Sequence, residues 1–449
     1  MTELAGIILA AGQGTRMKSA RPKVMHEVAG RPIIGHVMAA MRAAGISRIV
    51  VVMAADADEA RSYVTREGGE SVIQEPRLGT GHAANIAREV LSDIAGIVVT
   101  TYGDMPLLTA DCFAASLAAR EKTGLSLAAF RAADPGAYGR VILDEEGLLE
   151  RIVEFKDANA EERECDLCNA GIFAADARSF FRWTAALGND NAQKEYYLTD
   201  VPMLARREGV RCAVAVIAED DVMGVNDRAQ LAVAESYMQV RLVEAALQAG
   251  VGMTDPGTVR LSWDTILEPD VQIEPFVVFG PGVKVRSGAR IRSFSHLEGA
   301  EVGRNAVVGP HARLRPGAVL GENVHIGNFV EVKNSRIEHG AKANHLAYLG
   351  DATVGGGANI GAGTITCNYN GFDKSETNIG AGAFIGSNTS LVAPVTVGAG
   401  AFVGAGSTIA KDVAPDSLAV VRAEQVEKPG WAEKFRTRKK AEQAGKRGK

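Results

Sequence analysis

The stretch "EVGRNAVVGPHARLRPGAVLGENVHIGNFVEV", residues 301–332, decides the fold of the C-terminal half because its apolar residues recur every six positions. A helix would repeat near 3.6 residues and a half-buried strand near two. The apolar positions of the repeat, which continues beyond this stretch, are Val302, Val308, Leu314, Leu320, Ile326, Val332, Val354, Ile360, Ile379, Ile385, Leu391, Val397, Val403 and Ile409. Such a repeat predicts a parallel β-helix, in which each hexapeptide supplies one face of a coil and points its apolar residue inward.

The length of the repeat region and one break in its step of six extend this prediction. Roughly 160 residues at about eighteen per triangular coil predict about nine coils. The step of six is lost between Ile360 and Ile379. We therefore expect "TCNYNGFDKSETN", residues 366–378, to be a loop that leaves the coils. Loops on repeat scaffolds often carry binding groups.

A second informative stretch, "IILAAGQGTRMKSARPKV", spans residues 7–24. Its apolar run predicts a buried strand, and Gly12 and Gly14 then free the backbone for a tight turn. Exposed N–H groups at such a turn, together with Arg16 and Lys23, are typical of a phosphate cradle. The third glycine of a dinucleotide fingerprint and the Gly-Lys-Ser/Thr of a Walker loop are both missing from the stretch. The alternative is an ordinary strand-to-helix turn.

Alternating strand-like and helix-like segments over residues 1–226 predict an α/β domain, Rossmann-like, with a mainly parallel sheet covered by helices. Ligands of such sheets bind at the carboxyl ends of the strands, where the glycine turn lies. Residues 227–250 predict a long amphipathic helix that links this domain to the β-helix domain, residues 251–430. The basic residues 431–449 are expected to form a solvated, disordered tail.

Length, charge and cysteine content bound the function. The 449 residues are enough for two or more domains, and the formal net charge of −5 argues against a nucleic-acid binder. Without an apolar run of eighteen residues or an apolar leader in the sequence, we expect a cytoplasmic protein with no membrane insertion. Five scattered cysteines do not indicate a disulfide framework. Cys165 and Cys168 form one CxxC, which we interpret as two buried thiols in preference to a zinc site.

Five motifs occur in order along the chain: "LAAGQGTRMKSARPKV", "QEPRLGTGHA", "YGDMPLL", "GVND" and the hexapeptide region with "HLAYLGD". Together they resemble the bacterial bifunctional N-acetylglucosamine-1-phosphate uridyltransferase and glucosamine-1-phosphate acetyltransferase family, GlmU, over about residues 4–430. The resemblance implies a left-handed β-helix and the synthesis of UDP-N-acetylglucosamine for peptidoglycan and lipopolysaccharide precursors. Glucosamine 1-phosphate would be acetylated by acetyl-CoA, and UMP would then be transferred from UTP with release of pyrophosphate. Ala347 departs from the family, which has a hydroxyl residue there.

For the uridyltransferase domain, the resemblance implies that Arg16 and Lys23 are catalytic cations that neutralise the triphosphate and the leaving pyrophosphate. Asp104 and Asn226 match the family's Mg²⁺ ligands, and two protein oxygens suit an ion that completes its octahedron with water and phosphate. A plain turn or helix-cap role is the alternative for both. The implied binding residues are Gln74, Gly79 and Thr80 at the uracil, Tyr102, Gly139, Glu154 and Asn169 at the sugar, and Leu9, Ala10, Ala11, Gly12, Lys23, Gly103, Asp104 and Asn226 elsewhere along the nucleotide.

For the acetyltransferase domain, the resemblance implies that His345 is the general base, because an ammonium cannot attack a thioester. Arg315 and Lys333 match the residues that grip the sugar phosphate, and Tyr348 and Asn359 match those that line the sugar. The alternative for any single histidine on a β-helix is a solvated corner residue. The residues implied for acetyl-CoA binding are Ala362, Asn368, Tyr369, Ser387, Ala405 and Arg422.

Two other functions fit parts of the sequence. One is a nucleotidyltransferase whose β-helix only assembles the protein, and the other is a noncatalytic scaffold. A β-helix that only assembles the protein needs no base beside two phosphate-binding cations, which argues against the nucleotidyltransferase alternative. A noncatalytic scaffold would leave the cations and the acidic residue of the N-terminal domain without a purpose. We also expect a homotrimer, because the flat faces of a β-helix pack against copies of themselves and hexapeptide acyltransferases are generally threefold. The protruding loop and the segment around Arg422 would then reach a neighbouring subunit.

Overall fold

The computed structural model describes residues 3–191 and 193–447. The chain divides into two compact units. The first comprises residues 1–248 and 260–264, and the second comprises residues 249–259 and 265–449.

Helix α8, Arg228–Gln248, belongs to the first unit, whereas the sequence predicted a separate linker over this stretch. Its Ala234 is buried in an apolar cluster with Val28 and Ile33. Further along the helix, Arg241 donates a hydrogen bond of 2.6 Å to the carbonyl oxygen of Leu107. These contacts tie the helix to the sheet domain along much of its length, and the first unit therefore extends beyond its expected end.

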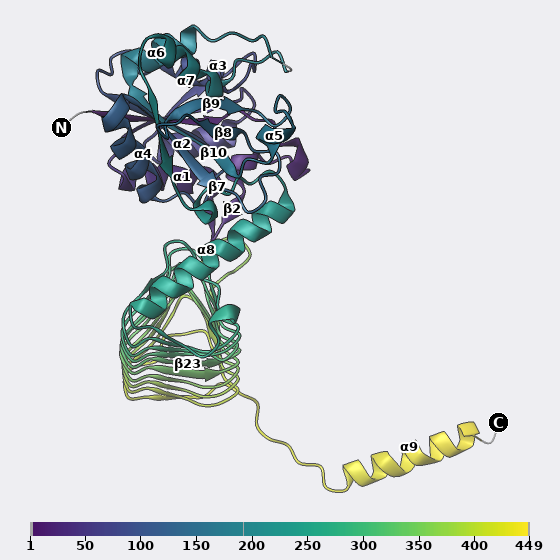
Figure 1. Ribbon diagram of the computed structural model, residues 1–449. Helices are drawn as coiled ribbons and strands as arrows, with labels where there is room; N and C mark the ends of the chain where they lie inside the picture. Colours follow the sequence, from purple (N-terminus) through teal and green to yellow (C-terminus); the bar gives the residue numbers. More distant parts are fainter. Residues whose placement is uncertain (1–2, 192, 448–449) are drawn as a thin grey trace. The chain divides into compact units, whose positions relative to one another are not determined.

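The first unit is built around a nine-stranded sheet with helices on both faces (Figure 1). The main strand order is β11-β7-β10-β6-β1-β4-β5, and β8 and β9 form an antiparallel pair beside β10. Strands β1, β4, β5 and β6 run parallel, as do β7 and β11, while β10 opposes β6 and β7. The strands are β1 (Leu4–Ala10), β4 (Arg48–Met53), β5 (Glu70–Ile73), β6 (Ile97–Tyr102), β7 (Leu125–Arg131), β8 (Arg140–Leu143), β9 (Leu149–Val153), β10 (Leu167–Asp176) and β11 (Cys212–Val216). The predicted mainly parallel sheet is confirmed.

Two apolar clusters, one on each face, hold the helices against this sheet. Strand β1 contributes to both, because Ile8 points into one cluster and Ile7 and Leu9 point into the other. The helices are α1 (Ile33–Ala43), α2 (Asp58–Arg66), α3 (Thr80–Ile86), α4 (Ala110–Thr123), α5 (Ala160–Arg163), α6 (Ala177–Ala185) and α7 (Val201–Arg207). A strand buried on both faces explains why the sequence of β1 is a continuous apolar run instead of an alternating one.

The second unit contains a parallel β-helix, drawn in Figure 1 as a stack of triangular coils. Its three sheets have ten, eight and eight strands, which agrees with about nine predicted coils. The first sheet runs from β12 (Gly252–Met253) to β37 (Leu418–Ala419), the second from β13 (Ile266–Leu267) to β34 (Val395–Val397), and the third from β15 (Val278–Phe279) to β36 (Thr408–Ile409). All fourteen apolar residues predicted to point inward are buried, none more than 4 % exposed. The hexapeptide prediction is therefore confirmed residue by residue.

One corner of the β-helix carries a column of rings, which we call the corner ladder: Phe276, Phe294, His311 and Phe329. Successive rings stack with centroids 5.2, 4.9 and 5.1 Å apart. All four residues have φ between 55° and 62°, in the left-handed region where a non-glycine residue is uncommon. The three phenylalanine side chains are more than half exposed, so the ladder presents a contiguous apolar edge.

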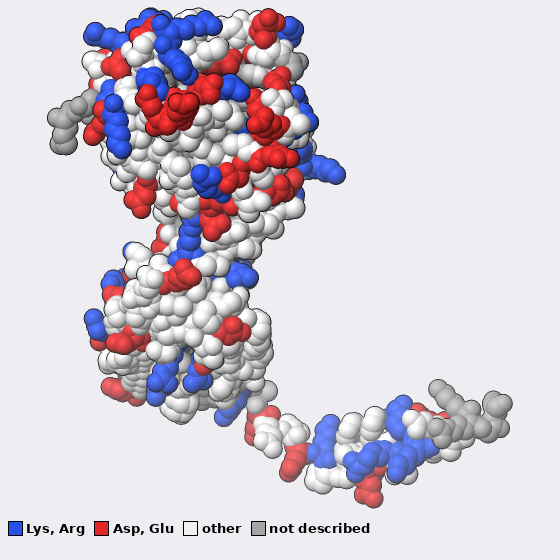
Figure 2. Space-filling model, in the orientation of Figure 1, with Lys and Arg blue, Asp and Glu red and all other residues white. Residues whose placement is uncertain are grey.

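Two segments outside the coils were also anticipated from the sequence. The chain leaves the coils between β30 (Ile365–Cys367) and β31 (Thr377–Ile379), and Phe372 there is 91 % exposed, so the expected loop is confirmed. The C-terminal segment instead forms helix α9, Trp431–Arg447, which differs from the expected disordered tail. Good helix formers and the stacked rings of Trp431 and Phe435, one turn apart, account for it. Figure 2 shows Lys and Arg side chains along the described part of this helix.

Candidate functional site

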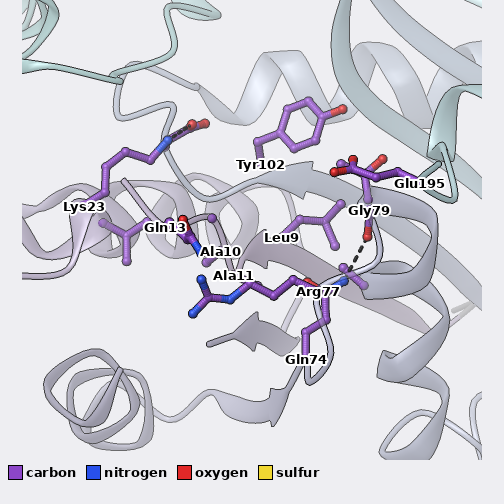
Figure 3. Close-up of a pocket in the computed structure, with 15 residues that line it drawn as sticks. Leu9, Ala10, Ala11, Gln13, Lys23, Gln74, Arg77, Gly79, Tyr102 and Glu195 are labelled. Carbon is purple, nitrogen blue, oxygen red and sulfur yellow. Dashed lines mark hydrogen bonds and ion pairs between the residues drawn. The ribbon is translucent and has the colours of Figure 1, made fainter. Parts of the chain in front are cut away.

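A cavity of about 510 Å³ opens at the carboxyl ends of β1 and β6, and residues that follow β5 also line it (Figure 3). Strand β4 lies between β1 and β5 in the sheet: Ala10 pairs with Met53 of β4, and Leu9 pairs with Tyr102 of β6. Ten of the residues implied for nucleotide binding line this one cavity: Leu9, Ala10, Ala11, Gly12, Lys23, Gln74, Gly79, Thr80, Tyr102 and Asp104. The topology thus gathers residues from four separate stretches of sequence at one edge of the sheet.

Two glycines allow the glycine turn to fold against its neighbours. Gly14 has a φ of 59°, and a Cβ added there would lie 2.8 Å from the Cβ of Lys23. The turn therefore brings the stem of Lys23 against Gly14. A Cβ at Gly103 would lie 2.9 Å from the Cβ of Ala10, so glycine is also needed where β6 ends beside β1.

Lys23 and Asp104, which line one end of the cavity, form a polar centre with Asn226, which contacts Lys23 but is not part of the lining. The Lys23 ammonium donates to Asp104 Oδ2 at 2.5 Å and to Asn226 Oδ1 at 3.2 Å. The side chains of Lys23 and Asp104 are 13 % and 22 % exposed, so the ion pair is largely shielded from water. Two oxygens predicted to bind one Mg²⁺ thus already converge on one cation, and this donor set fits a hard divalent ion.

The opposite end of the cavity is shaped by Gln74 and Gly79. Gln74 is 4 % exposed, and its Nε2 donates 2.9 Å to the carbonyl oxygen of Gly79. Gly79 has a φ of 107°, and a Cβ there would lie 2.7 Å from the carbonyl oxygen of Tyr196. The next residue, Thr80, accepts a hydrogen bond of 3.0 Å from the backbone N–H of Leu198. A side-chain amide held in this way can read the polar edge of a planar heterocycle.

The residues implied for the sugar form a wall next to Tyr102. Burial, followed by the nearby charges of Glu154 and Asp104, raises the pKa of Tyr102. Burial likewise raises the pKa of Glu154, whose Oε1 accepts 3.3 Å from the hydroxyl of Thr199. Asn169 is fixed by two hydrogen bonds of 2.8 Å: its N–H donates to the carbonyl oxygen of Gly139, and its Oδ1 accepts from Gly171. Gly139, Glu154 and Asn169 are not among the residues that line the cavity, whereas Tyr102 is.

Arg16 is not among the residues lining this cavity, whereas Arg77, which the sequence analysis did not single out, is. Arg16 is exposed and lies in the 3-10 helix Thr15–Met17. Arg77 donates 3.2 Å to Asp56, and Figure 3 shows it extending beneath Ala11 toward the side where Lys23 lies. Arg77 also lines an adjoining cavity of about 300 Å³, together with Lys23. The signal available in the sequence was its position inside "QEPRLGTGHA".

In the second unit, Arg315, Lys333 and Tyr348 lie close together on the third sheet. The N–H of Arg315 donates 2.9 Å to the carbonyl oxygen of Val332, which places Arg315 above Lys333 on successive coils. Lys333 pairs in turn with Gly350, over which the ring of Tyr348 folds. Arg315 also forms a 2.9 Å ion pair with Glu331. Two cations and a phenol on adjacent coils suit a sugar phosphate.

His345 lies at the end of β26 (Lys342–His345), on the first sheet of the β-helix. Its Nδ1 is 2.8 Å from Oδ1 of Asn328, at the end of the neighbouring strand β23 (His325–Asn328). Both residues line a cavity of about 240 Å³ whose lining does not include Arg315, Lys333 or Tyr348. A single chain therefore does not gather the base and the phosphate-binding cations around one cavity.

The residues implied for acetyl-CoA fall into two groups. Backbone hydrogen bonds join the coils at Ala362 and Ser387, and the Arg422 side chain donates 2.8 Å to the carbonyl oxygen of Ala405. Ala362, Ser387 and Ala405 therefore lie on successive coils of the β-helix. In the protruding loop, Tyr369 is 61 % exposed, whereas Asn368 is buried and donates to Asp351. Asn359 lies apart from both groups, paired with Lys342 between β26 and β29 (Asn359–Ile360).

The cysteines and the described helices add three observations. Cys165 and Cys168 are free thiols, half-buried and buried, and burial raises the pKa of Cys168 to about 11. Within the described residues, no group of three or more His, Cys, Asp or Glu side chains is placed to hold a metal ion. No helix of the described ranges has the length and apolarity needed to cross a membrane.

Comparisons with known proteins agree with the division of the chain into a sheet unit and a β-helix unit. Residues 6–168 match the MobA-like NTP transferase domain family, and residues 299–334 and 376–411 match the bacterial transferase hexapeptide family. The bifunctional protein GlmU of Rhodospirillum rubrum is 53 % identical over 439 residues, which are 97 % of this chain and 98 % of that protein. The proteins of the same name from Paramagnetospirillum magneticum and Maricaulis maris are each 50 % identical, covering 99 % and 98 % of both chains.

Proposed function

This chain belongs to the GlmU family of bifunctional proteins, and from that membership we propose the chemistry of its two units. The enzyme acetylates glucosamine 1-phosphate with acetyl-CoA and then transfers UMP from UTP to N-acetylglucosamine 1-phosphate. The products are UDP-N-acetylglucosamine and pyrophosphate. The N-terminal unit carries the nucleotidyl transfer and the β-helix carries the acetyl transfer.

In uridyl transfer, a phosphate oxygen of N-acetylglucosamine 1-phosphate attacks the α-phosphorus of UTP. The bond from that phosphorus to the bridging oxygen breaks, and pyrophosphate leaves. Lys23 and Arg16 neutralise the phosphate charges in this proposal. Asp104 and Asn226 would hold Mg²⁺, which would supply further charge neutralisation when bound. The observation that carries this assignment is the convergence of Lys23, Asp104 and Asn226 at one end of the cavity under the glycine turn.

Substrate positions follow from the two ends of that cavity. The uracil lies at the Gln74 end, where a buried side-chain amide and the backbone of Gly79 and Thr80 present hydrogen-bonding groups. The ribose and phosphates pass along the backbone from Leu9 to Gly12. The N-acetylglucosamine lies against the wall beyond Tyr102 and Gly103, which is formed by Gly139, Glu154 and Asn169.

In acetyl transfer, the amine of glucosamine 1-phosphate attacks the thioester carbonyl carbon of acetyl-CoA. His345 accepts the proton that the amine loses, the carbon–sulfur bond breaks, and CoA leaves as the thiol after protonation. Arg315 and Lys333 hold the sugar phosphate, with Tyr348 and Asn359 beside the sugar. Acetyl-CoA lies along the coils marked by Ala362, Ser387, Ala405 and Arg422, with Asn368 and Tyr369 at its side.

The protein is a homotrimer in this proposal, and its acetyltransferase sites are shared between subunits. Two observations support it. The corner ladder exposes a contiguous apolar edge that a soluble monomer would leave in water. The cavity beside His345 lacks the phosphate-binding cations, and Tyr369 extends from the coils on an exposed loop. A neighbouring chain can both cover the ladder and complete the site.

A coupled assay tests the proposal. The purified protein is supplied with glucosamine 1-phosphate, acetyl-CoA, UTP and Mg²⁺, and the release of CoA and of pyrophosphate is measured separately. Release of both products is expected. Pyrophosphate release that occurs only when N-acetylglucosamine 1-phosphate is supplied would reduce the β-helix to an assembly module. Release of neither product would refute both activities.

A further inference from the structure

We propose that Asn328 is a positioning residue that fixes His345 in the tautomer with a proton on Nδ1, so that Nε2 carries the lone pair that accepts the proton of the substrate amine. The inference rests on the proposed acetyl transfer and adds to it a residue that the sequence analysis did not identify. It also specifies which nitrogen of the base is reactive.

The two side chains are brought together by the register of the coils. Strands β23 and β26 are neighbours in the first sheet, and Asn328 pairs directly with His345 in their ladder. Between the matched residues, Gly327 faces the backbone of Asn344 so closely that an added Cβ would overlap its carbonyl oxygen. Glycine at 327 therefore permits the close approach that places Asn328 opposite His345. The result is the 2.8 Å contact between Oδ1 and Nδ1.

The chemistry of the two groups sets the direction of this hydrogen bond. An amide oxygen only accepts, so the imidazole Nδ1 must donate to it. In a neutral imidazole with Nδ1 protonated, the lone pair is on Nε2. When Nε2 accepts the amine proton, the ring becomes a cation, and the hydrogen bond to Asn328 becomes charge-assisted and stronger. Asn328 therefore orients the base and also stabilises the state that forms as the amine attacks.

The charged groups around this pair are few. In the cavity beside His345, Arg292 and His325 are the titratable side chains contributed by the packed coils. Lys342 lies on the same strand as His345, paired with His325 on one side and with the uncharged Asn359 on the other. Within the lining of this cavity, Asn328 is the side chain whose oxygen contacts the His345 ring.

The test compares Asn328→Ala and Asn328→Asp with a matched control, Asn378→Ala. Asn378 is an exposed residue of β31 in the second sheet, away from the pair. Acetyl transfer is measured as kcat/KM from pH 5 to 9, and the mass of each variant by light scattering, which depends on assembly through the β-helix in this proposal, serves as the check that it is folded. A second-layer partner of a reactive imidazole is typically worth about 10-fold to 100-fold in activity. We expect a loss of that size for Asn328→Ala and none for Asn378→Ala.

The pH profile separates positioning from a merely structural role. Asn328→Ala removes an acceptor that favours the cation, so the acidic limb of the profile should move to lower pH. Asn328→Asp keeps the acceptor and adds a negative charge, so the limb should move to higher pH and much of the activity should remain. In a His345→Ala background, Asn328→Ala should cause no further loss, because the two residues act as a unit.

Three results would overturn the inference: equal activity of Asn328→Ala and Asn378→Ala, an acidic limb that stays in place in both Asn328 variants, or a further loss in the double variant. If the wild-type protein itself transfers no acetyl group, the proposed function fails and the inference fails with it. A wild-type protein that is active beside an unaffected Asn328→Ala overturns only the role of Asn328. Should Asn328→Ala fail to fold, the pH profile of Asn328→Asp tests the inference: an acidic limb at higher pH supports it, and an unmoved limb overturns it.

Discussion

Replacing Asp104 by asparagine should separate the two activities. The carboxylate lies 2.5 Å from the Lys23 ammonium and is 22 % exposed, so its negative charge acts in a partly shielded site. Asparagine keeps an acceptor for Lys23, and we expect the free energy of unfolding to change by only about 1 kcal/mol. The metal site, however, loses its one charged ligand. A bound metal ion stabilises such a transition state by several kcal/mol, and a loss of about 4 kcal/mol corresponds to about 10³-fold in rate.

The assay measures pyrophosphate release from UTP and supplied N-acetylglucosamine 1-phosphate, and in parallel CoA release from acetyl-CoA and glucosamine 1-phosphate. Asp111→Asn, at an exposed aspartate in the first turn of α4, is the matched control. Uridyl transfer should fall about 10³-fold in Asp104→Asn alone, with acetyl transfer nearly unchanged in both variants. An equal fall of acetyl transfer in a folded Asp104→Asn protein would refute the separation of the sites. Undiminished uridyl transfer would remove Asp104 from the metal site.

Four further predictions concern the proposed base, two arginines, the oligomeric state and a buried histidine. His345→Ala should lower acetyl transfer by about 10² to 10⁴ with partial rescue at high pH, and full activity at neutral pH would refute its role as base. Arg77→Gln should raise the KM for UTP about tenfold, whereas Arg16→Gln should act on kcat; an unchanged KM would show that Arg77 lines the cavity without binding phosphate. Light scattering should give about 142 kDa, three times the chain mass of 47.3 kDa. Mixed trimers of His345→Ala and Tyr369→Ala chains should recover the acetyl transfer that neither variant shows alone. No recovery would show that each site lies within one chain. Burial lowers the pKa of His36 to about 4, so the contribution of its neutral form to stability is complete above about pH 6.5 and is lost as the pH falls toward 4. Calorimetry should therefore show that His36→Gln loses less stability between pH 7 and 5 than the wild-type protein does. An unchanged pH dependence would contradict the burial argument.

The sequence predicted best where a physical period forces the structure. The apolar residue at every sixth position of the repeat had to point inward, because any other phase would place Val308 or Ile326 in water. The glycine turn was equally readable, since the strand before it is buried on both faces. Lys23 lies at its expected place, because it follows the turn closely and packs against Gly14.

Other features depended on contacts that no local pattern encodes. Arg77 enters the cavity because its loop follows β5 at the same edge of the sheet, and Arg16, nearer in sequence to the turn, points outward. Asn328 and His345 are 17 positions apart, and their pairing depends on how many residues form each corner of the coil between them. Helix α8 looked like a linker because its packing partners, such as Leu107, lie more than a hundred residues earlier.

The loop that leaves the β-helix has a consequence for how such a chain can change over generations. Ile337 pairs with Val354 and Val354 pairs with Ile379, so the longer second step, which contains the loop, returns to the ladder in phase. Extra residues at that point are absorbed without turning any downstream side chain. Deleting a single hexapeptide would instead rotate everything after it by a third of a turn and carry His345 to another face. Lineages of this protein should therefore gain or lose whole coils or loop residues, while a lone missing hexapeptide upstream of His345 should be selected against as strictly as loss of the histidine itself.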